Sequence, residues 1–151
     1  MNTQPVNQKD PQSNVELRIR TLRTLWIALV LTVVGYYVFT LFTGRLRDIT
    51  PNPTMSLVLL AIGVLITLIS FPIKSKLLGS AIQQQQVALV QQAYIVTWAL
   101  TEVPALLGML DFYLTGHRQY YLLLIIAALG QLLHFPRREH VINASFKSPI
   151  L

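Results

Sequence analysis

The segment Leu57–Ile73 reads LVLLAIGVLITLISFPI and contains no charged residue. A helix that crosses a bilayer needs roughly 17–25 predominantly apolar residues, and this segment reaches that length. Polar stretches separate it from three more apolar segments, of which the last is the shortest: Leu25–Phe42, Ala93–Leu110 with an outer limit of Val87–Leu114, and Tyr120–Phe135. The sequence therefore predicts an all-α, polytopic membrane protein with four transmembrane helices.

The composition of the 151 residues also favours a membrane protein. Hydrophobic residues make up 53% of the chain and charged residues 12%, whereas soluble domains carry about 25% charged residues. The net charge of +6 is spread over short flanks of the apolar segments, so we expect the lipid bilayer, and no nucleic acid, as the partner of the basic residues. Because the chain has no cysteine and no recognisable catalytic or phosphate-binding motif, we expect no enzymatic activity, no cofactor and no metal.

The apolar and polar stretches divide the chain into four parts. These are a disordered N-terminal tail, an interfacial amphipathic helix, a four-helix transmembrane domain and a cytoplasmic C-terminal tail: residues 1–13, 14–24, 25–136 and 137–151. In the second part Val15, Ile19 and Leu22 recur at helical spacing between arginines. This pattern predicts a helix that lies on the membrane surface with these three side chains in lipid.

Lysine and arginine are distributed unequally around the predicted spans, and an even number of spans places both termini on one side. The flanks on that side carry nine of these residues: Lys9, Arg18, Arg20, Arg23, Lys74, Lys76, Arg137, Arg138 and Lys147. The opposite flanks carry three: Arg45, Arg47 and Arg118. Since cytoplasmic loops carry the excess of positive charge, the sequence predicts a plasma-membrane protein of the inner-membrane type with its N- and C-termini and the middle loop Lys74–Gln86 in the cytoplasm.

The two halves of the chain share a pattern of boundary residues. Trp26 precedes Thr43–Gly44 by the interval that separates Trp98 from Thr115–Gly116. Each half also ends its second span on Phe-Pro followed by basic residues, at Phe71–Pro72 and at Phe135–Pro136. The pattern favours a tandem parallel two-helix repeat. The alternative is that Trp, Gly and Pro mark span boundaries independently, as they do in many membrane proteins.

One acidic residue, Glu102, lies near the middle of the third predicted span. At about 1.5 Å per residue it is well over about 10 Å from either interface, where a charge costs several kcal/mol, so we expect a protonated carboxyl. Pro104 has no N–H and therefore leaves the carbonyl of Leu100 without its helical partner. A protonated Glu102, the hydroxyls of Thr97 and Thr101, or a trapped water can satisfy such freed groups. Two interpretations stay open: a hydrogen-bonding group that fixes the bundle, or an ion or proton site.

Three other polar residues lie near the ends of the predicted spans. Asp111 is nine residues from Glu102 and about half a turn around the helix, so the two carboxyls cannot form a paired acid site. We expect Asp111 to be a solvated boundary residue. We expect His134 at the inner interface in a structural role, and Tyr94 in the aromatic belt at the membrane surface.

The stretch Trp98-Ala-Leu-Thr-Glu-Val-Pro-Ala-Leu-Leu-Gly-Met-Leu resembles the carboxylate-bearing helix of the proteolipid, or c, subunits of rotary ATP synthases, over about residues 93–114. The resemblance implies that Glu102 carries the transported proton, that Gly108 is the family's later glycine, and that the polar loop Lys74–Gln86 corresponds to the family's cytoplasmic loop. The sequence departs from that family in two places. The preceding span has the single glycine Gly63 in place of a glycine ladder, and the loop lacks an Arg-Gln-Pro signature.

These features lead us to expect an accessory or scaffolding component of the membrane or of a larger membrane complex, as a homo-oligomer or with other subunits. The alternative is a proton- or ion-handling subunit in which Glu102 is the protonatable site and four neighbours support it: Thr97, Thr101, Pro104 and Gly108.

Overall fold

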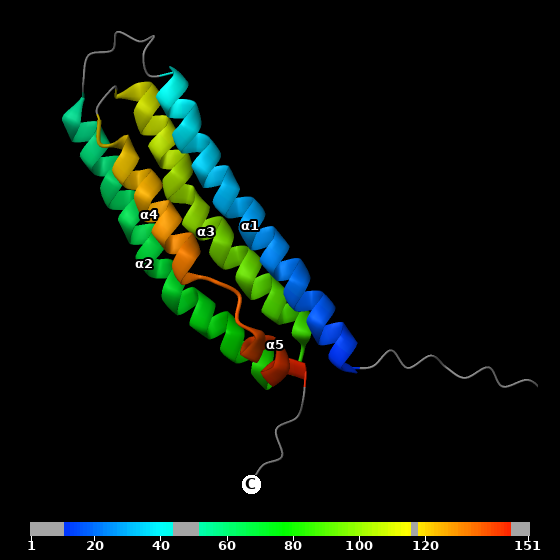
Figure 1. The fold of residues 1–151 in the computed structure, drawn as a ribbon. Coiled ribbons are helices and arrows are strands. Elements are labelled where there is room, and N and C mark those ends of the chain that lie inside the picture. Colours follow the sequence, from blue (N-terminus) through cyan, green and yellow to red (C-terminus); the bar gives the residue numbers. More distant parts are fainter. Residues whose placement is uncertain (1–10, 44–51, 116–117, 146–151) are drawn as a thin grey trace, which may run out of the picture.

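The computed structural model describes residues 11–43, 52–115 and 118–145. These residues form five helices and no strand (Figure 1). The helices are α1 (Pro11–Thr43), α2 (Pro53–Gln83), α3 (Val87–Leu114), α4 (Tyr120–Leu133) and α5 (Arg138–Ser145). The predicted all-α class is confirmed for this part of the chain.

The first four helices lie side by side and run alternately up and down, and α5 lies at the end of the bundle where α1 begins (Figure 1). The central helix is α3, which packs against all the others, α1, α2, α4 and α5. Of the three longest helices, α1 is the most peripheral, because only 11% of its most apolar stretch is buried, compared with 28% in α2 and 44% in α3. Most of the surface of α1 therefore faces away from the bundle.

Three helices, α1, α2 and α3, are long and apolar enough to cross a membrane. The pair α4 and α5 passes the same test when it is taken as one broken span with a bend of 45°. By length and composition the described residues thus contain three spans, or four if the bent pair counts as one.

The predicted interfacial helix and the predicted first span form one continuous helix, α1. Val15, Ile19 and Leu22 are only 5%, 2% and 2% exposed, and they pack against buried residues of α2, α3 and α5. The expectation that these three side chains lie in lipid is therefore wrong, because protein covers the apolar face of this segment. Of the predicted disordered tail, residues 1–10 lie outside the described part of the chain, and the remaining three begin α1.

The predicted middle loop Lys74–Gln86 is mostly helical. α2 continues past Pro72 through both lysines to Gln83, and only a short turn then precedes α3. Gln85 in this turn has a φ of 50°, a left-handed conformation that reverses the chain within a few residues. The prediction of a loop is therefore wrong for most of this segment, and the basic residues of α2 sit on a rigid helix.

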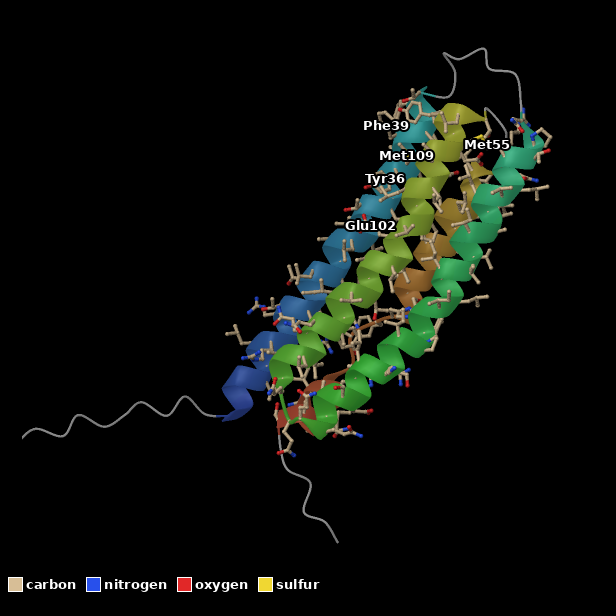
Figure 2. All side chains as sticks on the ribbon, turned by 180° about the vertical axis from the view of Figure 1, so that it is seen from behind. Tyr36, Phe39, Met55, Glu102 and Met109 are labelled. Carbon is tan, nitrogen blue, oxygen red and sulfur yellow. The ribbon has the colours of Figure 1, made fainter. Side chains whose placement is uncertain are left out.

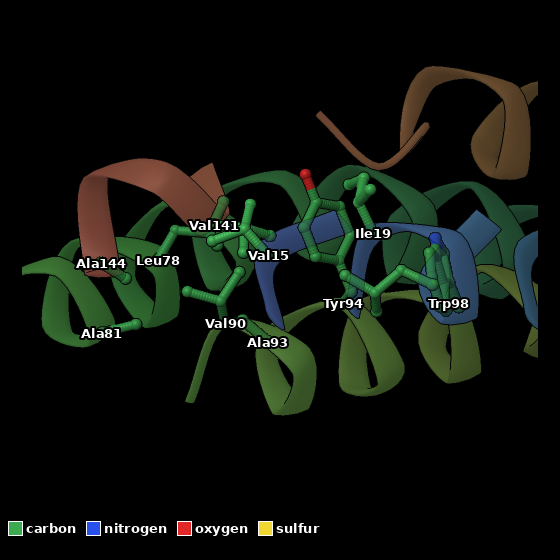
Figure 3. Packing of buried hydrophobic residues seen from close by; sticks show 11 residues of the cluster. Val15, Ile19, Leu78, Ala81, Val90, Ala93, Tyr94, Trp98, Val141 and Ala144 are labelled. Carbon is green, nitrogen blue, oxygen red and sulfur yellow. The ribbon is translucent and has the colours of Figure 1, made fainter. Parts of the chain in front are cut away.

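The predicted C-terminal tail contains α5, which docks on the end of the bundle. Pro136 has no N–H and cannot continue α4, so the chain bends before α5 begins. Val141 and Ala144 of α5 are fully buried. They belong to a group that we call the basal cluster (Figure 3): Val15, Ile19, Leu22, Leu78, Ala81, Val90, Ala93, Tyr94, Trp98, Val141 and Ala144. Residues 146–151 of the predicted tail lie outside the described residues.

Candidate functional site

Glu102 lies on the middle of α3 beside α1 and is partly exposed (Figure 2). Figure 2 shows it on the same side of the bundle as Tyr36 of α1 and Met109 of α3. Within the described part of the chain, its carboxyl forms no hydrogen bond and no ion pair. A carboxyl near the middle of a membrane span is costly unless it is protonated and bonded to a partner. The geometry therefore leaves this group available to a molecule that approaches the seam between α1 and α3.

The four residues expected to support Glu102 lie on a different part of the helix surface. These four residues are all buried and recur every three or four positions along α3: Thr97, Thr101, Pro104 and Gly108. They therefore form one face of the helix, which packs inside the bundle. Glu102 is only partly buried, and it does not belong to this buried face of α3. The structure thus does not gather the five residues into a single site.

The hydroxyls of Thr97 and Thr101 bond to their own helix. Thr97 Oγ1 donates to the carbonyl of Ala93 at 2.6 Å, and Thr101 Oγ1 donates to the carbonyl of Trp98 at 3.0 Å. Of the donors that the sequence offered for the freed carbonyl of Leu100, these two hydroxyls are therefore ruled out. Each hydroxyl instead reaches back about one turn, a bond that lets a polar side chain sit inside an apolar bundle.

Pro104 and Gly108 serve close packing between helices. A Cβ atom at Gly108 would lie 3.1 Å from both the Leu123 Cβ atom and the Tyr120 carbonyl oxygen, so the glycine lets α3 approach α4. Opposite Pro104, a Cβ atom at Gly63 of α2 would collide with the Leu123 side chain. These positions let three helices meet through small residues, the usual device of membrane bundles.

Asp111 is buried near the far end of α3, with 0% exposure. Ser56 of α2 donates its hydroxyl to Asp111 Oδ2 at 2.7 Å, and Thr115 donates its hydroxyl to Oδ1 at 2.6 Å. The expectation of a solvated boundary residue is wrong, because Asp111 joins α2 to α3 inside the bundle. The partner in α2 is 55 residues away in the chain, so local sequence could not indicate this bond.

Two indole rings hold the end of α4. Because Pro136 stops the helix, carbonyls near its end lack their usual N–H partners. Trp26 Nε1 donates to the carbonyl of Gln131 at 2.7 Å, and Trp98 Nε1 donates to the carbonyl of His134 at 3.1 Å. The Gln131 side chain in turn donates to the carbonyl of Trp98 at 3.2 Å. Trp26 and Trp98 thus attach α1 and α3 to the same point, the end of α4.

His134 is fully buried at this break. Its Nδ1–H donates to the carbonyl of Gly130 at 2.7 Å, its Nε2 lies 3.4 Å from Ser70 Oγ, and its ring centroid is 4.5 Å from that of Phe71. These contacts come from α2 and α4. The sequence pattern indicated a residue at the membrane interface, but the structure surrounds this imidazole with protein.

Four residues converge where α5 meets the bundle, and we call them the α5 junction: Lys74, Tyr94, Arg137 and His140. The Tyr94 hydroxyl accepts the backbone N–H of Arg137 at 3.0 Å and lies 2.6 Å from His140 Nδ1, to which it can donate. Burial lowers the pKa of His140, and the nearby charges of Lys74 and Arg137 lower it further, which favours the neutral ring that accepts this bond. Lys74 Nζ lies 5.0 Å from the centroid of the Tyr94 ring.

Tyr94 is 0% exposed, so the expectation that it belongs to a lipid-facing aromatic belt is wrong. Its hydroxyl needs a partner when the ring is buried, and His140 and Arg137 supply it from the other end of the chain. Sequence reasoning missed the α5 junction because its members are brought together only by the docking of α5.

Comparison of the chain with protein-family models, curated proteins and solved structures finds no match. In the residues that the structure covers, no three His, Asp or Glu side chains come together as metal ligands.

Proposed function

We propose that this chain is a four-span protein of the plasma membrane that serves as an accessory or scaffolding component of a larger membrane assembly, with both termini in the cytoplasm. The α5 end of the bundle supports this orientation, because it holds most of the described basic residues: Arg18, Arg20, Arg23, Lys74, Lys76, Arg137 and Arg138. The far end carries Arg118 among the described residues. An excess of lysine and arginine favours the cytoplasmic side.

The position of Glu102 carries the proposal of an accessory role. A polar side chain that faces outward at mid-span is stabilised when another membrane helix supplies its hydrogen-bonding partner. Glu102 lies beside α1, the least buried of the three longest helices. We infer that the seam between α1 and α3 accepts a helix from a second copy or from another subunit.

The surface of α1 away from the Glu102 seam offers further apolar area for helix contacts. Leu31 and Val34 are 62% and 50% exposed in its membrane-spanning part. An apolar groove of about 330 Å³ lies between α1 and α4 and is lined in part by Val34, Tyr37 and Tyr121. Close packing against such a surface drives helix association in lipid, where the hydrophobic effect between helices is absent.

A proton- or ion-handling subunit is the second candidate, and it uses the same residue. A carboxyl at the side of a bundle, rather than sealed inside it, can be loaded and unloaded by a neighbouring subunit, as the resemblance to proteolipid subunits implies. The partial exposure of Glu102 supports this alternative as well.

The orientation is tested with single cysteines, because the chain has none of its own. We expect an impermeant maleimide added to intact cells or spheroplasts to label the Thr54→Cys variant, at the far end of the bundle, and to spare the Gln83→Cys variant until the membrane is opened. Both positions are exposed in the structure, so access to the side chain does not differ between them. The parent chain is the unlabelled control, and outside labelling of Gln83→Cys would overturn the orientation.

The role of Glu102 is tested with two substitutions of different chemistry. If Glu102 makes an accessory contact, Glu102→Gln should preserve it, since the amide keeps most of the hydrogen-bonding capacity of a neutral acid. Glu102→Leu should weaken the contact about fivefold, because it removes an interhelical hydrogen bond worth roughly 1 kcal/mol. The measurement is the amount of companion subunit, or of second copy, that co-purifies in mild detergent. Met109→Leu, on the same side of α3, is the matched control.

An ion-handling site predicts a different pattern from the same variants. Glu102→Gln should then assemble like the parent and abolish proton or ion flux in reconstituted vesicles, because an amide cannot release a proton. If Glu102→Leu assembles and conducts like the parent, both candidate functions of this residue are wrong.

A further inference from the structure

The α5 junction brings a partly buried cation, Lys74, and an exposed one, Arg137, to the same tyrosine. Lys74 is partly buried with its Nζ above the ring of Tyr94, and Arg137 is attached to the same tyrosine by its backbone N–H. Both residues therefore contact the same tyrosine. A lysine at the end of a span usually extends into water or headgroups, whereas this one is retained over an aromatic face.

The charge at this place has little compensation from the protein. His140 adds a third basic residue to the junction, with its Nδ1 atom 2.6 Å from the Tyr94 hydroxyl. The ion pair within the described residues joins Arg138 to Glu16 at 3.6 Å on an exposed surface. Glu139 is exposed and acts on His140. An anion bound beside a partly buried cation such as Lys74 would offset the cost of removing its charge from water.

We propose that the α5 junction binds a phosphate group, with Lys74 and Arg137 as its cationic ligands. Lys74 follows directly on the apolar segment of α2, and Arg137 follows the end of α4. This is the level at which a span meets the headgroup region, where each basic residue contributes attraction to anionic lipid. The phosphodiester of an anionic lipid and free phosphate share the required chemistry. The site is independent of Glu102 and of any partner helix.

The test uses the full chain purified in neutral detergent, with three probes: phosphatidylglycerol, phosphatidylcholine and inorganic phosphate. Binding is measured by native mass spectrometry for the lipids and by thermal stabilisation for all three. We expect the parent to prefer phosphatidylglycerol over phosphatidylcholine, and we expect Lys74→Gln and Arg137→Gln each to weaken that binding about fivefold. Lys76→Gln is the matched control, since Lys76 is exposed two residues further along the same helix.

The Arg137 side chain is exposed, and its backbone N–H stays in place when the side chain is changed, so Arg137→Gln tests the site without disturbing the fold. If inorganic phosphate stabilises the parent but not the Lys74→Gln variant, the result would support the site with free phosphate as its ligand. A response to phosphatidylglycerol alone would support it with lipid as the source. The proposal fails if no probe binds, if both variants bind like the parent, or if Lys76→Gln weakens binding equally.

Discussion

Replacing Trp98 with alanine should lower the free energy of unfolding by about 3–5 kcal/mol, the range for truncating a large buried aromatic side chain. Trp98 is 1% exposed, its ring centroid lies 5.4 Å from that of Tyr94, and its Nε1–H donates to the carbonyl of His134. The variant therefore leaves a cavity in the basal cluster and an unpaired carbonyl at the break before α5. Unfolding in mixed micelles of mild detergent and dodecyl sulfate, followed by circular dichroism, measures the change.

Two further variants separate the contributions of Trp98. Trp98→Phe keeps most of the apolar contact and removes the N–H donor, so it should cost clearly less than alanine. Ile95→Ala on the same helix is the control, because Ile95 is 45% exposed and should change stability by no more than about 0.5 kcal/mol. Equal losses in Trp98→Ala and Ile95→Ala would contradict a specific role for the basal cluster.

The positions of the helices follow from features that act locally along the chain. An uncharged apolar run such as Leu57–Ile73 forms a helix because a membrane or a bundle interior leaves no other partner for its backbone. The outer limit Val87–Leu114 coincides with α3, and Tyr120–Phe135 extends only two residues past α4. The extension of α2 to Gln83 was missed, because polar residues mark the end of a span without marking the end of a helix.

The local sequence pattern could not indicate whether lipid, water or protein covers a given face of a helix. Periodic apolar residues in a basic helix look the same whether lipid or protein faces them, and Ile19 packs against residues of α2, α3 and α5 that are distant in the sequence. Asp111 likewise resembles a solvated boundary residue until Ser56 is brought to it by the pairing of α2 with α3. For Glu102 the sequence did not indicate which face of α3 carries it, since Thr97 and Thr101 turn away from it into the bundle.

The second large effect is expected at Ile19, where the structure and the sequence pattern disagree. Ile19→Ala should lower the free energy of unfolding by about 2–4 kcal/mol, because this side chain is 2% exposed and fills the basal cluster among α2, α3 and α5. A residue that merely rests in lipid would leave the unfolding of the bundle almost unchanged. The same micelle titration measures the change, and hydrogen exchange of the α5 amides should rise in the variant, since α5 is held by this cluster.

Leu17→Ala provides the matched control, with the same helix, a similar loss of volume and a side chain that is 64% exposed. We expect its stability to remain within about 0.5 kcal/mol of the parent. If Leu17→Ala destabilised the bundle and Ile19→Ala did not, the start of α1 would have to turn its other face to the protein. Similar small effects from both would instead return residues 14–24 to the membrane surface, because a helix that lies in lipid contributes little to the packing of the bundle whichever face is truncated.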